Sequence, residues 1–238
     1  MSGKVTRLTE TELSEWFNNL SNGANIEFIF GGSFDPVHIG HINVIEKLRE
    51  NCSDWPIRLL PCAVPALKNA TSGNFEQRVN MLRIATEHID NIVIDERENA
   101  RMGISYTIDS LQDLTEEKYL TKFVLVIGMD TFKNMNQWHQ WHHLKDYCHL
   151  LLVNRPGSSI ENIDSEMQQL GFDCTKNVQK LELLPSGHYY CLNIEEKDIS
   201  STGIRSNLQR GLSVKSLVPS KVIDYIKKNL IYQKETLF

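Results

Sequence analysis

Short apolar runs alternate along this chain with longer stretches that carry apolar residues at helical spacing. Runs rich in β-branched and aromatic residues predict strands at Ile26–Phe30, Ile57–Leu60, Asn91–Ile94, Phe123–Ile127, His149–Val153 and Val178–Leu184. The clearest helical stretches are His41–Asn51, Phe75–Ile89, Tyr106–Leu114 and Phe132–Leu144. Because strands and helices alternate, we expect parallel strands joined by right-handed crossovers. The pattern therefore predicts an α/β fold with a doubly wound parallel sheet in a single domain.

A further helical pattern precedes the first strand. Residues 9–12, Thr-Glu-Thr-Glu, match a capping box. Apolar residues then follow at helical spacing, namely Leu13, Trp16, Phe17 and Leu20. We interpret residues 1–24 as an N-terminal amphipathic helical extension that packs on the surface of a main domain, residues 25–238. A partner-binding role for this helix is the less favoured alternative.

The last third of the chain is patterned less evenly. Residues Asn154–Gln179 show no clear element, and a loop is expected after the strand that ends near Val153. Pro219 and Ser220 start a predicted helix over Lys221–Asn229. Its expected apolar stripe consists of Val222, Ile223 and Ile226.

The most informative segment is Gly31–His41, which reads Gly-Gly-Ser-Phe-Asp-Pro-Val-His-Ile-Gly-His. A strand, a glycine-rich turn and a helix bind phosphate through exposed backbone N–H groups and the positive helix N-terminus. His38 and His41 supply imidazole donors, Ser33 adds a hydroxyl, and Gly40 allows close backbone approach. The string matches neither the Walker A loop nor the dinucleotide-binding fingerprint. We therefore predict a different kind of nucleotide loop, at the carboxyl edge of the sheet.

A second candidate anion site is the segment Ile199–Arg205, which reads Ile-Ser-Ser-Thr-Gly-Ile-Arg. Its three hydroxyl residues, Ser200, Ser201 and Thr202, suit the N-terminus of a helix that would continue over Ile204–Leu212. The Arg205 guanidinium can bind two phosphate oxygens at once. Taken alone, these residues would only cap the helix. Together with the first loop, they predict a second binding site for the phosphates of one ligand.

Composition and charge exclude some classes of protein but do not identify the function. The chain has 238 residues, of which 41% are hydrophobic and 23% charged, which is typical of a soluble globular protein. Its net charge of -5 argues against broad nucleic-acid binding. No apolar run approaches ~18 residues, and no signal-peptide core follows Met1, so neither a membrane span nor export is expected. The five cysteines are scattered, which favours free thiols in a reducing cytoplasm.

The two candidate phosphate segments together resemble the signatures of the nucleotidylyltransferase superfamily, His-x-Gly-His and Ile-Ser-Ser-Thr-x-x-Arg. Within it, the chain is most similar to the nicotinate-nucleotide adenylyltransferases of NAD synthesis. Further similar segments are Ser105–Leu111, Ile127–Phe132, Trp138–Trp141, Asn154–Gly157 and Leu217–Ile226. The resemblance runs from about Glu27 to Tyr232. One position departs from the family pattern, because Leu67 stands where the family has histidine, although Lys68 remains.

The resemblance implies a Rossmann-like fold and transfer of the adenylyl group of ATP to nicotinate mononucleotide, giving deamido-NAD and pyrophosphate. The residues that it makes catalytic are His38, His41, Lys68 and Arg205. Those that it assigns to ATP are Gly32, Ser33, Phe34, His38, Gly40, His41, Gly128, Asp130, Ser201, Thr202 and Arg205. Those that it assigns to the mononucleotide are Tyr106, Thr107, Trp138 and His139, with Trp138 stacking on the pyridine ring.

The expected chemistry needs no general base, because the attacking 5′-phosphate is already anionic. Catalysis would then consist of positioning and charge neutralisation. We expect Mg²⁺ to accompany ATP and to be held by substrate phosphates and water, with no metal site made by the protein alone. The expected partners are ATP and a pyridine mononucleotide, with no nucleic acid and no membrane, and the sequence leaves a homo-oligomer open.

Four alternative functions stay open at this point. The chain could prefer nicotinamide mononucleotide, which differs by an amide in place of a carboxylate. It could also be a nucleotide-binding sensor that has lost turnover, for which Leu67 is the only hint. His38–His41 also matches the signature of class I aminoacyl-tRNA synthetases, but the chain lacks their second, lysine-rich loop. A phosphopantetheine or cytidylyl transferase fits less well, because Tyr106, Thr107 and Trp138 indicate a flat aromatic substrate.

Two smaller signals have simple structural interpretations. His139 and His143 are four residues apart on a predicted helix, a spacing that can bind zinc. No cysteine or carboxylate joins them, so we favour packing with exposed polar tips. The charge run Glu96–Glu98 is expected to be a solvated loop.

Overall fold

The computed structural model describes residues 25–51, 53, 55–67, 71–101, 103–154, 163–174, 184–194 and 199–233. The predicted N-terminal extension, residues 1–24, lies outside this part of the chain, as does Lys68. The described cysteines Cys62, Cys148, Cys174 and Cys191 are free thiols. Within the described residues, no helix has the length and apolar character that a membrane crossing requires.

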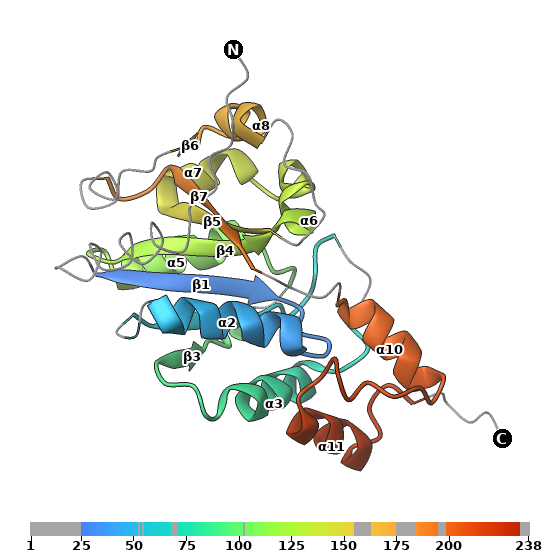
Figure 1. Cartoon of the computed structure of the whole chain (residues 1–238). Helices are drawn as coiled ribbons and strands as arrows, with labels where there is room; N and C mark the ends of the chain where they lie inside the picture. Colours follow the sequence, from blue (N-terminus) through green and yellow to red (C-terminus); the bar gives the residue numbers. More distant parts are fainter. Residues whose placement is uncertain are drawn as a thin grey trace.

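The described residues form one parallel sheet of seven strands in the order β3-β2-β1-β4-β5-β7-β6 (Figure 1). The strands are β1 (Ile26–Gly32), β2 (Ile57–Pro61), β3 (Ile92–Ile94), β4 (Lys122–Gly128), β5 (Cys148–Asn154), β6 (Asp173–Cys174) and β7 (His188–Asn193). Consecutive residues of β5, Leu150 to Leu152, are fully buried. Burial of successive residues is typical of a parallel sheet that is covered on both faces. This confirms the doubly wound α/β fold.

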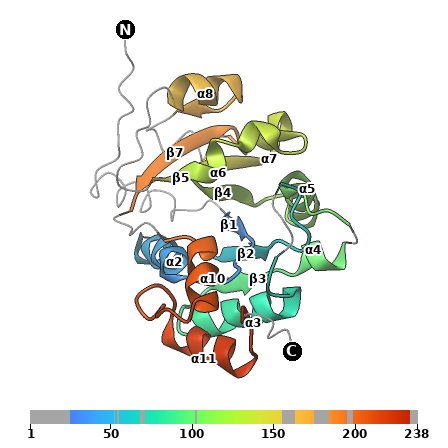
Figure 2. The ribbon, with the colours of Figure 1, turned by 90° about the vertical axis from the view of Figure 1, so that its right-hand side faces the viewer.

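Helices cover both faces of the sheet (Figure 2). They are α2 (Ile39–Asn51), α3 (Phe75–Thr86), α4 (Arg97–Ala100), α5 (Thr107–Glu117), α6 (Met129–Phe132), α7 (Leu144–Tyr147), α8 (Ile163–Gln169), α10 (Ser201–Gln209) and α11 (Ser220–Lys228), with short 3-10 turns η1 (Met135–Gln137) and η2 (Trp141–His143). One core contains Ile45 of α2 and Ile226 of α11. The other contains Leu111 of α5 and Met167 of α8. The predicted stripe of α11, Val222, Ile223 and Ile226, is buried.

The predicted long helix over Phe132–Leu144 is wrong. The chain there forms four short pieces, α6, η1, η2 and α7. The helix is interrupted because Trp138 is extended, with ψ 146°, and Gln140 is left-handed, with φ 49°. His139 and His143 therefore do not share a helix, and the spacing on which a zinc site was considered does not exist.

Two other differences concern the end of the sheet. The predicted strand Val178–Leu184 falls mostly outside the described residues, and Leu184 is not in a strand. Instead, β7 supplies the strand beside β5, and its buried residues include Tyr189 and Tyr190. The sequence analysis did not predict β7, whose apolar residues are flanked by histidine and asparagine.

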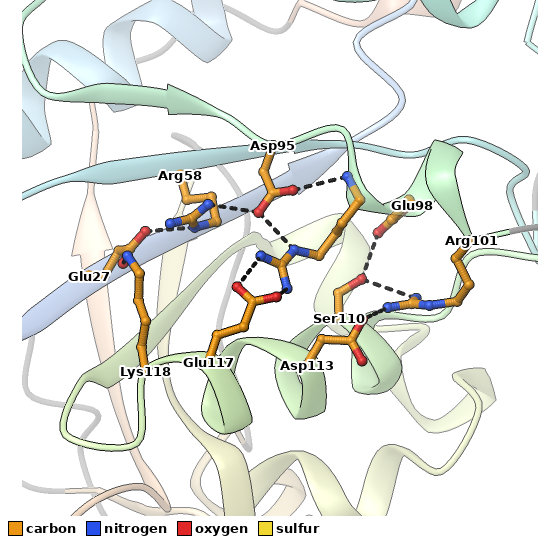
Figure 3. A network of polar contacts seen from close by, with 10 residues as sticks. Glu27, Arg58, Asp95, Glu98, Arg101, Ser110, Asp113, Glu117 and Lys118 are labelled. Carbon is orange, nitrogen blue, oxygen red and sulfur yellow. Dashed lines mark hydrogen bonds and ion pairs between the residues drawn. The ribbon is translucent and has the colours of Figure 1, made fainter.

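The charge run Glu96–Glu98 is a solvated loop only at Glu96, which is exposed and pairs with the exposed Arg83. Glu98 is 7% exposed and lies in α4. The Arg97 side chain is 14% exposed and contacts Asp95 at 2.7 Å and Glu117 at 2.9 Å. Arg97 and Glu98 therefore belong to a buried polar network that joins the sheet to α5 (Figure 3).

The centre of this network is Arg58 of β2. Its guanidinium contacts Glu27 of β1 at 2.6 Å and Asp95, just after β3, at 2.7 Å (Figure 3). The side chains of Glu27 and Asp95 are 1% and 8% exposed, so water screens these pairs little. Lys118 contacts the second oxygen of Glu27 at 2.6 Å. The network thus connects three neighbouring strands through Glu27 of β1, Arg58 of β2 and Asp95 just after β3.

Replacing Arg58 by methionine should destabilise the fold strongly, because it leaves two buried carboxylates short of a cation. We expect Arg58→Met to lower the free energy of unfolding by about 3 kcal/mol. The matched control is Arg83→Met, since the ion pair of Arg83 with Glu96 is exposed and should contribute less than about 1 kcal/mol. Urea unfolding of both variants measures the difference, and equal losses would contradict it.

Candidate functional site

The candidate site lies where the strand order reverses, between the carboxyl ends of β1 and β4. From these adjacent strands the chain turns to opposite faces, to α2 after β1 and to α6 after β4 (Figures 1 and 2). Gly31 and Gly128 lie near these strand ends, and a Cβ placed on either would meet no atom within 4 Å. Ligands of open parallel sheets bind at such a switch point. The strand ends are therefore open to a ligand.

The glycine-histidine loop begins with a tight turn around a buried phenylalanine. Phe34 is 1% exposed and has a left-handed backbone, with φ 47°. Its ring contacts His41 edge-on, with centroids 5.0 Å apart. A Cβ at Gly32 would lie 3.2 Å from this ring, which is closer than an ordinary contact, so a side chain there would press on the ring. Phe34 thus packs against His41 and supports it.

The two loop histidines stack on each other at the start of α2. Their ring centroids are 3.7 Å apart and their planes differ by 25°. The Nδ1 of His41 accepts the backbone N–H of His38 at 3.2 Å. In the neutral ring the proton is therefore on Nε2, which leaves His41 a donor. No acidic residue occupies the first turn of α2, so the positive potential of the helix N-terminus is not offset there.

A buried aspartate holds the loop in place. Asp35 is 2% exposed, and its Oδ2 accepts the Ser72 N–H at 2.8 Å. Its Oδ1 accepts the Gly73 N–H at 2.9 Å and the Tyr232 hydroxyl at 2.7 Å. A Cβ at Gly73 would come within 3.1 Å of both Asp35 Oδ1 and the Tyr232 hydroxyl, so a side chain there would force these two groups to shift. One carboxylate thus ties the loop to the start of α3 and to the segment after α11.

Arg78 of α3 fixes the loop from below. It is fully buried and donates to the Ser33 carbonyl at 2.7 Å and to the Gly73 carbonyl at 3.3 Å. Burial lowers the pKa of Arg78, and the nearby Asp35 carboxylate opposes this shift. Its guanidinium also lies 5.3 Å from the ring centre of Phe75. A buried cation therefore holds the Ser33 carbonyl of the loop and the Gly73 carbonyl before α3.

The second candidate segment meets the first, as the sequence predicted. Ser200 caps α10 by accepting the Gly203 N–H at 3.2 Å. Ser201 donates from its hydroxyl to the Pro36 carbonyl at 3.0 Å. Arg205 donates to the Asp35 carbonyl at 2.7 Å and to the Thr202 hydroxyl at 3.3 Å. α10 thus brings its hydroxyl residues and Arg205 against the glycine-histidine loop.

The candidate mononucleotide residues gather on the other side of the switch point. Tyr106 precedes α5, Thr107 begins it, and the Tyr106 ring lies 4.3 Å from that of His139. Trp138 is half-buried against the core of this face, while His139 is exposed. These residues form an aromatic group from two separate segments. Asp130, in the first turn of α6, is exposed.

Comparisons with known proteins identify the family. The Cytidylyltransferase-like family model matches residues 29–207. A protein from Legionella pneumophila (strain Paris), named as a probable nicotinate-nucleotide adenylyltransferase, is 36% identical over 206 residues, which are 86% of this chain and 98% of the relative. A protein of the same name from Yersinia enterocolitica is 34% identical over 217 residues, 90% of this chain and 99% of that one.

The chain belongs to the nicotinate-nucleotide adenylyltransferase family.

A solved structure agrees with this family at the level of the fold. It is the Plasmodium falciparum nicotinic acid mononucleotide adenylyltransferase complexed with NaAD, which has a TM-score of 0.67 and 22% identity. The match covers 87% of this chain and 97% of that one. The family thus shares the Rossmann-like sheet on which the candidate site lies.

Sequence reasoning missed three residues that shape this family member's site, namely Asp35, Arg78 and Tyr232. A signal existed for the first two. An aspartate inside a loop that binds anions must be neutralised, and Arg78 interrupts the apolar face of a predicted helix. Tyr232 gave no such signal, because it is 197 residues from its partner.

Removing the Tyr232 hydroxyl should abolish its hydrogen bond to Asp35 while keeping the ring in place. We expect Tyr232→Phe to lower the free energy of unfolding by about 2 kcal/mol, since the hydrogen bond is buried and its acceptor is charged. Tyr225→Phe is the control, because the Tyr225 hydroxyl meets only the neutral Asn80 amide, at 3.3 Å, and should cost about 0.5–1 kcal/mol. Chemical denaturation compares the two, and a smaller loss for Tyr232→Phe would contradict the role given to it.

Proposed function

We propose that this protein transfers the adenylyl group of ATP to nicotinate mononucleotide, with deamido-NAD and pyrophosphate as products, as a step of NAD synthesis. The observation that carries the proposal is that α10 brings Arg205 against the loop that carries the stacked His38 and His41, at the switch point of the sheet. The donors of these two segments are proposed to bind the triphosphate together. Membership of the family supports this substrate pair, and its relatives carry the name of the activity.

The reaction would proceed by direct displacement. A phosphate oxygen of the mononucleotide attacks the α-phosphorus of ATP, the bond from this phosphorus to the bridging oxygen breaks, and pyrophosphate leaves with the electron pair. His41, which keeps a proton on Nε2, donates a hydrogen bond to oxygens that gain charge. Arg205 binds the departing phosphates, with help from Ser201 and Thr202. We assign Lys68 the same kind of role.

The pyridine carboxylate is proposed to bind at the N-terminus of α5. No side-chain hydrogen bond caps this end, so the first N–H groups of the helix can donate to a ligand. The positive end of the helix favours a carboxylate over a neutral amide. The carboxylate of Asp109, in the same turn, lies 3.9 Å from the Arg101 guanidinium. This ion pair reduces the repulsion between Asp109 and a bound anion. Tyr106, His139 and Trp138 would surround the ring.

Mg²⁺ is proposed to accompany ATP. Among the described residues, no three His, Cys, Asp or Glu side chains are placed to hold a metal ion. The ion is proposed to be carried by phosphate oxygens and water. When bound, Mg²⁺ would neutralise part of the triphosphate charge. Gly128 and Asp130 are assigned to the adenosine ribose, for which their place at the end of β4 is suitable.

The test of the function is pyrophosphate release from ATP with each mononucleotide in turn. We expect kcat/KM for nicotinate mononucleotide to exceed that for nicotinamide mononucleotide by about tenfold or more, because a charged group binds a helix N-terminus better. The dinucleotide product is identified by mass. A higher kcat/KM for nicotinamide mononucleotide would make that compound the substrate instead. Nucleotide binding without pyrophosphate release would indicate a sensor.

The role of His41 has its own test. We expect His41→Ala to lower kcat by about 10²–10³-fold, the usual effect of removing one donor to a transition-state charge. His143→Ala is the control, since the exposed His143 contacts Asp146 and lies outside the candidate site. A near-normal kcat in His41→Ala would show that His41 does not stabilise the transition state.

A further inference from the structure

Two segments of the candidate site approach each other without an apolar core between them. They are the loop after β2, residues 62–67, and residues 103–107, which lead into α5. Val64 and Ile104 are 50% and 48% exposed, so their packing contributes little to holding the segments together. Ile108 and Leu111 anchor the body of α5 in the core, so polar contacts are what join the residues before it to the loop after β2.

Ser105 makes most of these contacts. Its hydroxyl oxygen accepts the N–H groups of Ala63 and Val64, each at 3.2 Å. Its own N–H donates to the Val64 carbonyl at 2.9 Å, and Ser105 and Pro65 form an isolated parallel bridge. A hydroxyl has two acceptor positions and one donor. Ser105 uses both acceptor positions on a single loop.

A buried carboxylate, Glu98, contacts the same loop. It accepts the Ala63 N–H, one of the two that the Ser105 hydroxyl accepts, at 3.4 Å. It also accepts the Ser110 hydroxyl at 3.4 Å, from one helical turn further along α5 (Figure 3). Burial raises the pKa of Glu98, and its hydrogen bonds and the nearby Arg101 oppose this. Glu98 thus joins α4, the loop after β2 and α5.

We propose that Ser105 and Glu98 are positioning residues for the mononucleotide, and that they do so by fixing the N-terminus of α5 against the loop after β2. This rests on the proposed function, which places the mononucleotide at Tyr106, Thr107 and His139. Ser105 precedes Tyr106 directly, so a shift of Ser105 moves the ring that contacts His139 and the first N–H groups of α5. Neither Ser105 nor Glu98 needs to touch the substrate.

The first experiment separates the two substrates kinetically. Ser105→Ala removes both acceptor contacts and should raise KM for nicotinate mononucleotide about tenfold, with KM for ATP changed less than about twofold. Ser105→Thr keeps the hydroxyl and should restore most of the loss. The matched control is Thr115→Val, which removes a hydroxyl from the same helix, where it donates only to the Leu111 carbonyl at 2.8 Å. Unchanged KM for the mononucleotide, or an equal rise in both KM values, would overturn the proposal.

The second experiment needs no substrate. Amide hydrogen exchange should become faster at residues 63–64 in Ser105→Ala, but not in Thr115→Val, because only the first variant removes the hydroxyl that accepts both N–H groups. The larger change is expected at Val64, because Ala63 keeps Glu98 as a second acceptor. Unchanged exchange would show that the contact does not hold the loop. If the wild-type protein releases no pyrophosphate, the proposed function fails, and the exchange result still decides whether Ser105 fixes the loop.

Glu98→Gln covers the case in which Ser105→Ala does not fold. It keeps the size of the side chain but replaces one acceptor oxygen by a donor group. We expect the same pattern with a smaller rise, about threefold, in KM for the mononucleotide alone. A folded Glu98→Gln protein with wild-type KM values would overturn the role of Glu98.

Discussion

The carboxylate of Asp35 is the group on which the candidate site depends most. It lies inside a loop that is proposed to bind anions, where an exposed negative charge would repel the ligand. The structure removes this conflict, because both oxygens of Asp35 are occupied by N–H and O–H donors and the Arg205 guanidinium lies 3.6 Å away. Hydrogen bonds to a charged acceptor are roughly twice as strong as neutral ones. The same charge that would harm binding therefore organises the loop.

The donors to the loop come from distant parts of the chain. Gly73 and Arg78 lie at the start of α3, Arg205 lies in α10, and Tyr232 follows α11. The buried stripe of α11 packs in the same core as α2 and α3, which places Tyr232 beside the loop. The loop geometry is thus completed only when the C-terminal helices have packed on the sheet.

The sequence predicted the fold well and the site in part, for reasons that differ between segments. Alternating strands and helices follow local periodicity, so five of the six predicted strands were found near their expected positions. Phe132–Leu144 failed because the left-handed Gln140 has no sequence signature as clear as glycine. The two phosphate segments were recognisable as motifs, and the structure brings them into contact at Ser201 and Arg205. Asp35, Glu98 and Tyr232 act through partners far along the chain, which periodicity does not reveal.

Arg205 is bound to the loop backbone and yet remains 24% exposed. A guanidinium has five N–H donors in a rigid plane, and two of them meet Asp35 and Thr202. The others can reach a ligand while these contacts persist. A lysine at this position has one compact ammonium group on a flexible stem. It could not keep the contacts with Asp35 and Thr202 and bind the phosphates at the same time. The position therefore selects for the shape of the cation as well as for its charge.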